Sequence, residues 1–329
     1  MKHRTLGVLL FICLLLARVT ASVAADQVIR VALPGPVAVY LPVWVAKDFG
    51  FFKKYDLEVE TVYAGSSAMA LASLVKGDIQ IQSGTEVSIT SYLGGYRDLA
   101  LFAALDYRLP FIIYAQPSIK KASELRGKKI GVTRLGGSLD FAVRYWLKQS
   151  GLDPKKDVTI LQVGRVPDLL GALVGGSVDA VGMPIPFNFI AKKQGFEELA
   201  DLTKNGPRYA VSSFMAKKDF LVDNEARMEG WIKAIIEAIH FIKTHRDESI
   251  KELGNNIRVT DSEVIPLAYD KYVKLWPRVP EIKPDDIKLV IEHISLTRPE
   301  AREIDPAERI YSRLVENVVK SGFVEQVYK

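Results

Sequence analysis

The chain contains a single cysteine among its 329 residues, and that residue, Cys13, lies near the N-terminus. A disulfide needs two thiols, so no disulfide can form within the chain. The segment around Cys13 has the pattern of a secretory signal peptide: residues 2–4 are basic, 6–17 are apolar and 22–25 are small. We expect residues 1–25 to be removed on export, which leaves a mature chain without a thiol nucleophile or a thiolate metal ligand.

Membrane attachment is not expected. The apolar segment is short for a membrane span and is followed by Arg18, and no later apolar run reaches the length of one. The residue before Cys13 is Ile12, whereas a lipid-attachment site would have a small residue there. The sequence therefore predicts a periplasmic or otherwise extracytoplasmic protein that carries no lipid.

The chain also lacks a strong charge of either sign. Its net charge of +5 falls to about +2 when Lys2, Arg4 and Arg18 leave with the signal peptide. The remaining lysines and arginines are scattered, so no nucleic-acid footprint is present and no nucleic-acid partner is expected. The mature chain of about 304 residues is long enough for two lobes with hydrophobic cores.

Strand-like and helix-like segments alternate from residue 28 to residue 194, which predicts an α/β fold with parallel-rich sheets. The expected strands are 28–34, 57–64, 79–83, 99–105, 111–115, 129–134, 158–164 and 178–183. The expected helices are 41–54, 68–76, 85–93, 139–149, 167–173 and 187–194.

The helical period takes over after residue 225, with helices expected at 225–245, 262–275, 284–294 and 306–320. Residues 209–216 alternate as a strand would and are expected to return the chain to the first lobe. The sequence thus predicts a discontinuous first lobe (26–110 and 210–329), a second lobe (111–209) and two crossings near 106–115 and 208–216. Two backbone crossings form a hinge.

Two strand-to-helix turns carry small residues. One contains Gly65, Ser66 and Ser67, and the other Gly136, Gly137 and Ser138. The first N–H groups of a helix lack partners and the helix dipole favours negative charge there, so each turn could bind an oxyanion. The spacing from Gly131 to Gly136 is that of a phosphate loop, but Gly137 stands where that motif has lysine, so nucleotide binding is not expected.

Further segments are similar to a known family: 40–42 (YLP), 46–52 (AKDFGFF), 74–79 (LVKGDI), 124–132 (ELRGKKIGV) and 176–180 (GSVDA). In this order and spacing they resemble the type II periplasmic binding proteins of ABC importers, in the branch that serves nitrate, sulfonate, taurine and thiamine-precursor uptake. The resemblance covers nearly the whole mature chain. It implies a two-lobed, hinged, monomeric receptor without a cofactor or metal, which takes a small ligand and delivers it to a permease with its ATPase.

Ligands of open α/β sheets lie beyond the carboxyl ends of the strands. The loops there supply the candidate ligand-binding residues, in which Arg134 and Arg165 would grip an anion and Tyr40 and Phe187 would stack on a ligand body. The full set is Pro36, Tyr40, Ser66, Ser67, Gly84, Thr85, Asp106, Arg134, Gly136, Gly137, Ser138, Arg165, Met183, Pro184 and Phe187. Each has a simpler interpretation as a helix cap, a tight turn, a surface ion pair or a core side chain. Glu86 is explained by the helix dipole alone.

Two other functions stay open. The fold implied by the resemblance also occurs in thiamine-pyrimidine synthases and desulfinases, which would use a cysteine or metal-linked histidines. Here the mature chain lacks cysteine, and His240 and His245 are five residues apart, a spacing that does not place two zinc ligands on one helix face. No catalytic residues are therefore assigned. A sensor subunit for a membrane receptor is the second alternative. The ligand itself is expected to be a small organic anion; sulfonate, carboxylate, nitrate and pyrimidine are not separated by the sequence.

Overall fold

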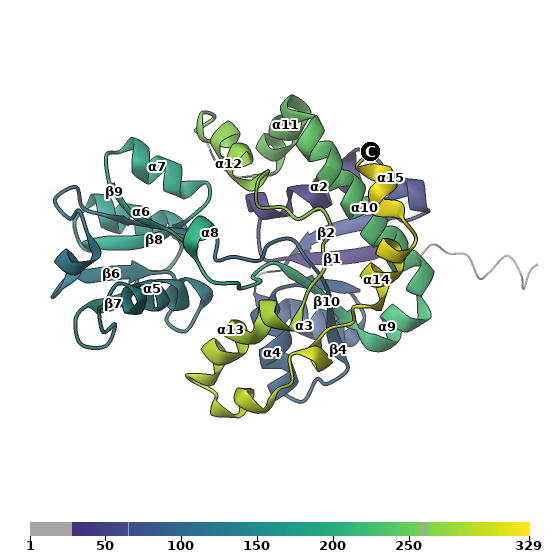
Figure 1. Cartoon of the computed structure of the whole chain (residues 1–329), viewed down its shortest axis with the longest axis horizontal. Coiled ribbons are helices and arrows are strands. Elements are labelled where there is room, and N and C mark those ends of the chain that lie inside the picture. Colours follow the sequence, from purple (N-terminus) through teal and green to yellow (C-terminus); the bar gives the residue numbers. More distant parts are fainter. Residues whose placement is uncertain (1–27, 65, 258, 260) are drawn as a thin grey trace, which may run out of the picture.

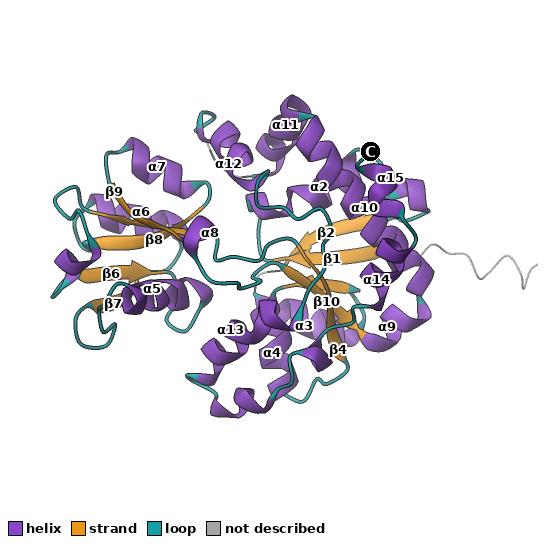
Figure 2. Ribbon diagram, viewed as in Figure 1, coloured by secondary structure: helices purple, strands orange, loops and turns teal. Residues whose placement is uncertain are grey.

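The structure is a computed structural model that describes residues 28–64, 66–257, 259 and 261–329. The expected signal peptide and Gly65 lie outside the described residues. Two five-stranded sheets lie side by side, each flanked by helices (Figures 1 and 2). The chain is therefore a two-lobed α/β protein, as the sequence predicts, and each sheet is the centre of one lobe.

The first sheet has the strand order β2-β1-β3-β10-β4. β1, β2 and β3 are parallel, and β10 runs antiparallel between β3 and β4. β10 follows the second lobe in sequence, so it returns the chain to the first sheet, as predicted for residues 209–216. The strand bounds are Ile29–Leu33 (β1), Val59–Tyr63 (β2), Ile81–Ser83 (β3), Leu99–Ala104 (β4) and Ser213–Lys217 (β10).

The second sheet has the order β7-β6-β8-β5-β9, in which β6, β7 and β8 are parallel and β5 is antiparallel to both of its neighbours. All five residues of β5 are buried, which explains its unbroken apolar sequence. The bounds are Phe111–Ala115 (β5), Lys129–Val132 (β6), Thr159–Gln162 (β7), Ala180–Pro184 (β8) and Glu197–Asp201 (β9).

The helices cover the sheets and extend the first lobe (Figure 1). Those of the first lobe before the crossing are Leu41–Asp48 (α2), Ser67–Lys76 (α3) and Thr85–Leu93 (α4). The second lobe has Ser138–Gln149 (α5), Val166–Val174 (α6), Phe187–Lys193 (α7) and Leu202–Asn205 (α8). The C-terminal part has Lys218–Asp223 (α9), Glu225–Thr244 (α10), Arg246–Asn256 (α11), Val264–Tyr272 (α12), Pro284–Ser295 (α13), Arg313–Lys320 (α14) and Phe323–Val327 (α15). Short 3-10 helices span Ala38–Tyr40, Lys53–Tyr55, Ala122–Leu125, Pro299–Glu303 and Ala307–Arg309.

Aromatic packing fixes the long helix α10 on the first sheet. The Trp231 ring lies 6.1 Å from Phe52, 5.4 Å from Phe102 and 5.0 Å from Phe214, measured between centroids, and is fully buried. In the second lobe α5 packs closely on β8, because a Cβ added at Gly182 would lie 2.4 Å from Leu139 Cδ1. A side chain at position 182 would push α5 away from the sheet.

Two predicted helices are shortened by the structure, and a further helix was not predicted. The helix expected at 41–54 ends at Asp48, because Gly50 turns the chain at a φ of +80°. The helix expected at 306–320 starts only at Arg313, because Tyr311 N donates to Leu101 O at the edge of the first sheet. The helical tail also continues after residue 245 as α11, which the sequence interpretation missed.

β9 and α8 were missed as well. The β9 sequence Glu-Glu-Leu-Ala-Asp has no β-branched residue, so propensity does not indicate a strand, and its pairing with β5 decides the conformation.

The two crossings between lobes are bonded to each other. Tyr209 N donates to Tyr107 O at 3.1 Å, and Leu105 N donates to Ser212 O at 3.0 Å. Residues 105–110 and 206–212 therefore form one paired, two-stranded connection between the sheets, which is the arrangement of a hinge.

Candidate functional site

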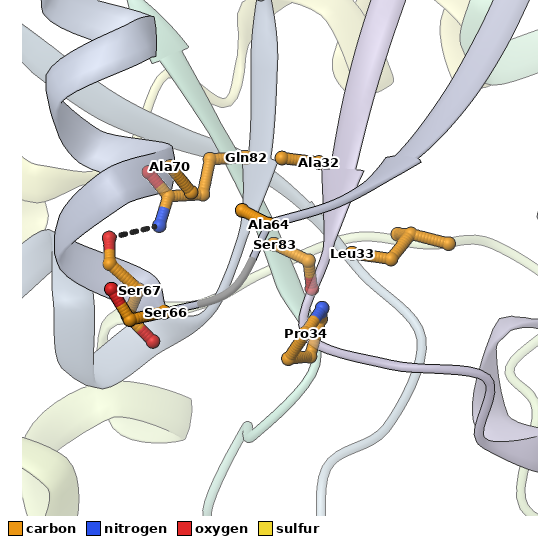
Figure 3. Close-up of a pocket in the computed structure, with 9 residues that line it drawn as sticks. All are labelled: Ala32, Leu33, Pro34, Ala64, Ser66, Ser67, Ala70, Gln82 and Ser83. Carbon is orange, nitrogen blue, oxygen red and sulfur yellow. Dashed lines mark hydrogen bonds between the residues drawn. The ribbon is translucent and has the colours of Figure 1, made fainter.

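A small cavity lies where α3 begins, beyond the carboxyl ends of β1 and β2 (Figure 3). Its volume is about 140 Å³. Ser66 is the N-cap of α3, and its Oγ accepts a hydrogen bond from Met69 N at 3.2 Å. Such a cap stabilises a helix by about 1 kcal/mol. The cavity is lined by Ala32, Leu33, Pro34, Ala64, Ser66, Ser67, Ala70, Gln82 and Ser83.

No lining residue of this cavity carries a charge. Its polar groups are three hydroxyls and the Gln82 amide, whose Nε2 donates to Ser67 O at 3.1 Å. Because Ser66 Oγ only accepts from the helix, its own hydrogen is left to donate to a ligand. A helix N-terminus with free hydroxyl donors suits a single small oxyanion group, stabilised by dipoles and not by a salt bridge.

Three of the predicted residues contact strands beside this cavity: Tyr40, Gly84 and Thr85. The Tyr40 hydroxyl is 2.8 Å from Ser83 Oγ, and burial raises the pKa of Tyr40 above its ordinary value. Thr85 Oγ1 donates to Ser213 Oγ at 2.7 Å, and Gly84 N donates to Ser213 O at 2.8 Å. Gly84 has a φ of +134°, a conformation that favours glycine. Tyr40 and Thr85 are buried, so they position β3 and β10 in this arrangement, whereas Pro36 is half-buried.

Asp106 lies in the first crossing and holds the second one. Its Oδ1 accepts from Val211 N at 2.8 Å and from Ser212 N at 3.0 Å, and its Oδ2 accepts from Ser212 Oγ at 2.9 Å. Burial raises the pKa of Asp106 to about 6, although these hydrogen bonds favour the ionised form. The geometry makes Asp106 a clamp of the hinge.

The turn before α5 presents Arg134 on the other lobe. Arg134 is exposed. Burial raises the pKa of Glu86 and lowers that of His293, and the positive charge of Arg134 opposes the first shift and adds to the second, so Arg134 is close enough to act on both residues of the first lobe. Gly136 has a φ of +75° and its N donates to Asp140 Oδ2 at 2.9 Å, which closes the turn. Gly137 is then the N-cap of α5, and Ser138 is its first residue.

The other candidates of the second lobe contribute less to the gap. The Arg165 side chain is 83% exposed and pairs with Asp168, with Nε 3.1 Å from Oδ2, as part of the cap of α6. Met183 is fully buried within β8, and Pro184 pairs with Phe111 in the sheet. Phe187 is half-buried at the start of α7. Contact of any of these residues with a ligand stays a prediction.

A polar cluster that sequence reasoning missed joins the lobes beside α5. The Tyr209 hydroxyl donates to Glu86 Oε1 at 2.9 Å and lies 3.0 Å from His293 Nδ1. The Phe141 ring of the second lobe packs in a tilted arrangement against His293, with the ring centroids 4.6 Å apart. Burial lowers the pKa of His293 to about 4 and raises that of Glu86 and Tyr209. The four side chains come from segments that are far apart in the sequence. Only Glu86, which follows a predicted strand, could be recognised from the sequence as a residue near a strand end.

Ion pairs join the lobes at the opposite edge of the gap. One set links the end of α7 to the residues before α12, and another links β9 to α12 itself. Lys193 Nζ lies 3.1 Å from Asp261 Oδ2 and 2.6 Å from Glu263 Oε2, and Lys271 pairs with Asp201. Burial raises the pKa of Asp201, but the hydrogen bonds from Lys271 and Thr203 outweigh it and hold the pKa below the ordinary value.

Among residues 28–64, 66–257, 259 and 261–329 there is no group of three or more His, Cys, Asp or Glu side chains that could hold a metal ion. None of the helices in this part of the chain is long and apolar enough to cross a membrane.

Two lobes, a paired hinge and a polar cavity at a helix start define the periplasmic-binding-protein fold. The chain belongs to the NMT1-like family, which it matches over residues 35–257. It is 26% identical over 242 residues to YtlA of Bacillus subtilis, named as a binding protein, covering 71% of this chain and 72% of YtlA. It is 25% identical to the nitrate/nitrite binding protein NrtA of a Nostoc species, covering 62% of this chain and 51% of NrtA.

Solved structures of the same fold include binding proteins and an enzyme. The aliphatic sulphonate binding protein SsuA of Escherichia coli superposes with a TM-score of 0.73 at 21% identity, covering 88% of this chain and 93% of SsuA. The desulfurization enzyme DszB superposes with a TM-score of 0.67 at 15% identity, covering 90% of this chain and 99% of DszB. At these identities the superpositions establish the fold and not the activity.

Proposed function

We propose that this NMT1-like protein captures a small organic anion between its lobes and delivers it to the permease of an ABC importer, which works with its ATPase. The observation that carries the proposal is the placement of two complementary half-sites. An uncharged cavity at the start of α3 offers hydroxyl and helix-dipole donors, and the turn at the start of α5 in the other lobe carries the exposed Arg134. Closure of the hinge would bring the arginine toward an anion held at Ser66 and Ser67.

The lobe limits proposed from the sequence are 26–110 with 210–329, and 111–209. They are supported by the paired connection at 105–110 and 206–212, since a boundary belongs where few contacts cross.

The ligand class is supported by chemistry and by the relatives. Ligands named for relatives include nitrate or nitrite, bicarbonate and sulphonates, all of which are oxyanions. The cavity at the start of α3, called the head cavity below, has a volume of about 140 Å³ and can hold one such oxyanion group. We propose an organic sulfonate or carboxylate, whose body would lie outside the head cavity.

Binding without catalysis is proposed because the relatives are binding proteins, although DszB shows that the fold also carries enzymes. Residues 28–329 contain no cysteine. We also propose that residues 1–25 direct export, that the protein carries no lipid and that it is a monomer. These three proposals follow from the sequence pattern and the resemblance.

A thermal-shift screen of the exported protein against sulfonates, carboxylates, nitrate and pyrimidines tests the proposal. A ligand at a hundred times its dissociation constant stabilises a protein by about 2.7 kcal/mol, which is easily measured. The proposal predicts a shift with sulfonates or carboxylates. Turnover of the compound, or a shift with pyrimidines alone, would contradict it.

Two arginines provide a matched pair of variants for any anion that binds. Arg134→Ala is expected to lower the affinity about tenfold or more, because a charge-assisted hydrogen bond contributes about 1.5–3 kcal/mol. Arg165→Ala is expected to lower it less, since Asp168 already holds that side chain at the surface. Equal affinities for Arg134→Ala and the parent, measured by calorimetry, would remove Arg134 from the site.

A further inference from the structure

A second and much larger cavity lies between the lobes, with α5 on one side and α13 on the other. Its volume is about 990 Å³, and it shares no lining residue with the cavity at Ser66. Binding sites for organic molecules occupy roughly 300–1,000 Å³. The lining residues are Leu135, Gly136, Asp140, Phe141, Arg144, Tyr145, Lys148, Leu152, Asp153, Pro154, Lys155, Leu289, Glu292, His293, Leu296 and Thr297.

Each helix turns one continuous face to this cavity. Phe141, Tyr145 and Lys148 follow one another at spacings of four and three residues along α5. Leu289 and Glu292 of α13 and its C-cap residue Leu296 follow one another at spacings of three and four residues. Residues at these spacings share a helix side, so the cavity walls are regular helix surfaces.

The walls are largely apolar and rich in rings. The rings of Phe141 and His293 are in tilted contact across the gap with their centroids 4.6 Å apart, and the Tyr145 ring centroid lies 6.0 Å from that of Phe141. Leu135 and Leu296 keep 48% and 62% of their surface exposed, although both line the cavity. Large apolar side chains exposed in a concave site favour an apolar occupant.

The charges of the cavity are not balanced within the protein. Asp140 Oδ1 accepts from Arg144 Nε at 2.8 Å, and Asp153 Oδ2 lies 3.9 Å from the ammonium of Lys156, so each of these two carboxylates has a cation beside it. In the described part of the chain, neither the Lys148 nor the Lys155 ammonium has an acidic oxygen within 4.0 Å. Two unpaired ammonium groups thus stand on the second-lobe side against one carboxylate, Glu292, on the first.

We propose that this cavity is a second binding site, which takes an amphipathic organic anion. The apolar or aromatic body would lie between Phe141, Tyr145 and the leucines of α13, and the anionic end would meet Lys148 and Lys155. Because the two walls belong to different lobes, an occupant would also bias the distance between the lobes and so couple to the head cavity. The inference does not rest on the transport function proposed above.

Two fluorescent probes that differ in one group test the ligand class. 8-Anilinonaphthalene-1-sulfonate and N-phenyl-1-naphthylamine share the same rings, and only the first is anionic. The proposal predicts one saturable site for the sulfonate, with at least about tenfold weaker binding of the neutral amine. Equal affinity of the two probes, or no saturable binding of the sulfonate, would overturn it.

Matched variants locate the site. The double variant Lys148→Gln/Lys155→Gln is expected to weaken binding of the sulfonate probe severalfold, whereas Lys192→Gln, at an exposed position of the same lobe outside the cavity, leaves it unchanged. Leu289→Asn should weaken both probes, and Lys288→Gln on the same helix neither. Melting temperatures establish that each variant is folded. If Ser67→Ala abolishes binding of the sulfonate probe and none of the variants of the larger cavity does, the probe binds at the head cavity and the proposal is overturned. The proposed transport function is not affected by that result.

Discussion

The two edges of the gap between the lobes are built from different interactions. The edge at α7 and α12 is closed by the ion pairs of Lys193 and Lys271. The edge at α5 and α13 has a ring contact, the Tyr209 cluster and a cavity of about 990 Å³. Ion pairs between exposed groups are weak and salt-sensitive, whereas ring packing persists in salt. The two edges should therefore respond differently to salt: the exposed ion pairs of Lys193 weaken as the salt concentration rises, whereas the ring contact at the α5 edge does not.

The largest expected effect is on the hinge that both edges share. Asp106→Ala leaves the buried N–H groups of Val211 and Ser212 without an acceptor, and we expect it to lower the free energy of unfolding by about 3 kcal/mol. Denaturant unfolding measures this loss. Glu58→Ala, at an exposed position, is the control and should stay within about 0.5 kcal/mol of the parent. Equal losses in the two variants would mean that Asp106 does not clamp the hinge.

The α5 edge should respond to acid through His293. Burial lowers its folded pKa from 6.5 to about 4, while Glu86, Arg134, Asp140 and Arg144 surround it. The unfolded chain therefore takes up a proton at His293 first as the pH falls, so the contribution of His293 to stability is full above pH 6.5 and declines toward pH 4 by about 3 kcal/mol. The raised pKa values of Asp106 and Glu86 act in the opposite direction, so the His293 contribution is read from the difference between the parent and a variant.

His293→Phe keeps a ring against Phe141 and should remove this decline, which melting temperatures across the pH range will reveal. His245→Phe, at an exposed histidine, should retain it. A pH profile of His293→Phe that runs parallel to that of the parent would assign the effect to another group.

The α12 edge should respond to acid at lower pH. The pKa of Asp201 is held below its ordinary 3.8, so its contribution is present above that value and is lost as the pH falls through the folded pKa. Lys271→Ala removes the cation and should destabilise the protein by about 1–2 kcal/mol at neutral pH, because Asp201 stays half-buried. Lys274→Ala, just beyond α12, serves as the comparison. Identical unfolding curves for the two variants would show that the pair does not contribute.

The smallest effect is expected for Lys193→Gln, which removes the exposed ion pairs of the same edge. The radius of gyration from X-ray scattering should rise slightly at low salt and match the parent at high salt, because screening weakens the pairs in the parent as well. Lys192→Gln is the neighbouring control. A change that persists at high salt would argue against an ionic origin.

The sequence predicted the two lobes, the hinge and the turn that carries Ser66 and Ser67, because these depend on local signals. Strand-to-helix turns with Ser66 or Gly137, and the change of period after residue 225, are visible in short windows. The polar cluster of Glu86, Tyr209 and His293 could not be predicted, because hydrogen bonds 123 and 84 residues apart in sequence arise only from the packing of α13 on α4. The same holds for the cavity between α5 and α13.

Side-chain roles were less predictable than loop positions. Arg134 and Arg165 both follow strands, yet Arg165 is held by Asp168, three residues further on, whereas Arg134 is exposed in the turn before α5. Tyr40, Thr85 and Met183 lie at the strand ends as expected but turn inward. The sequence indicates which loops surround a site, and packing decides which of their side chains reach it.

The most direct test of the central claim, that the lobes close on an anion, is an interlobe distance with and without ligand. Cys13 is the only cysteine, so with Cys13→Ser spin labels can be placed selectively at Gln149→Cys on α5 and Lys288→Cys on α13. Electron–electron double resonance should show a shorter, narrower distance distribution when the tightest-binding sulfonate or carboxylate is saturating. An unchanged distribution in the presence of bound ligand would contradict the account.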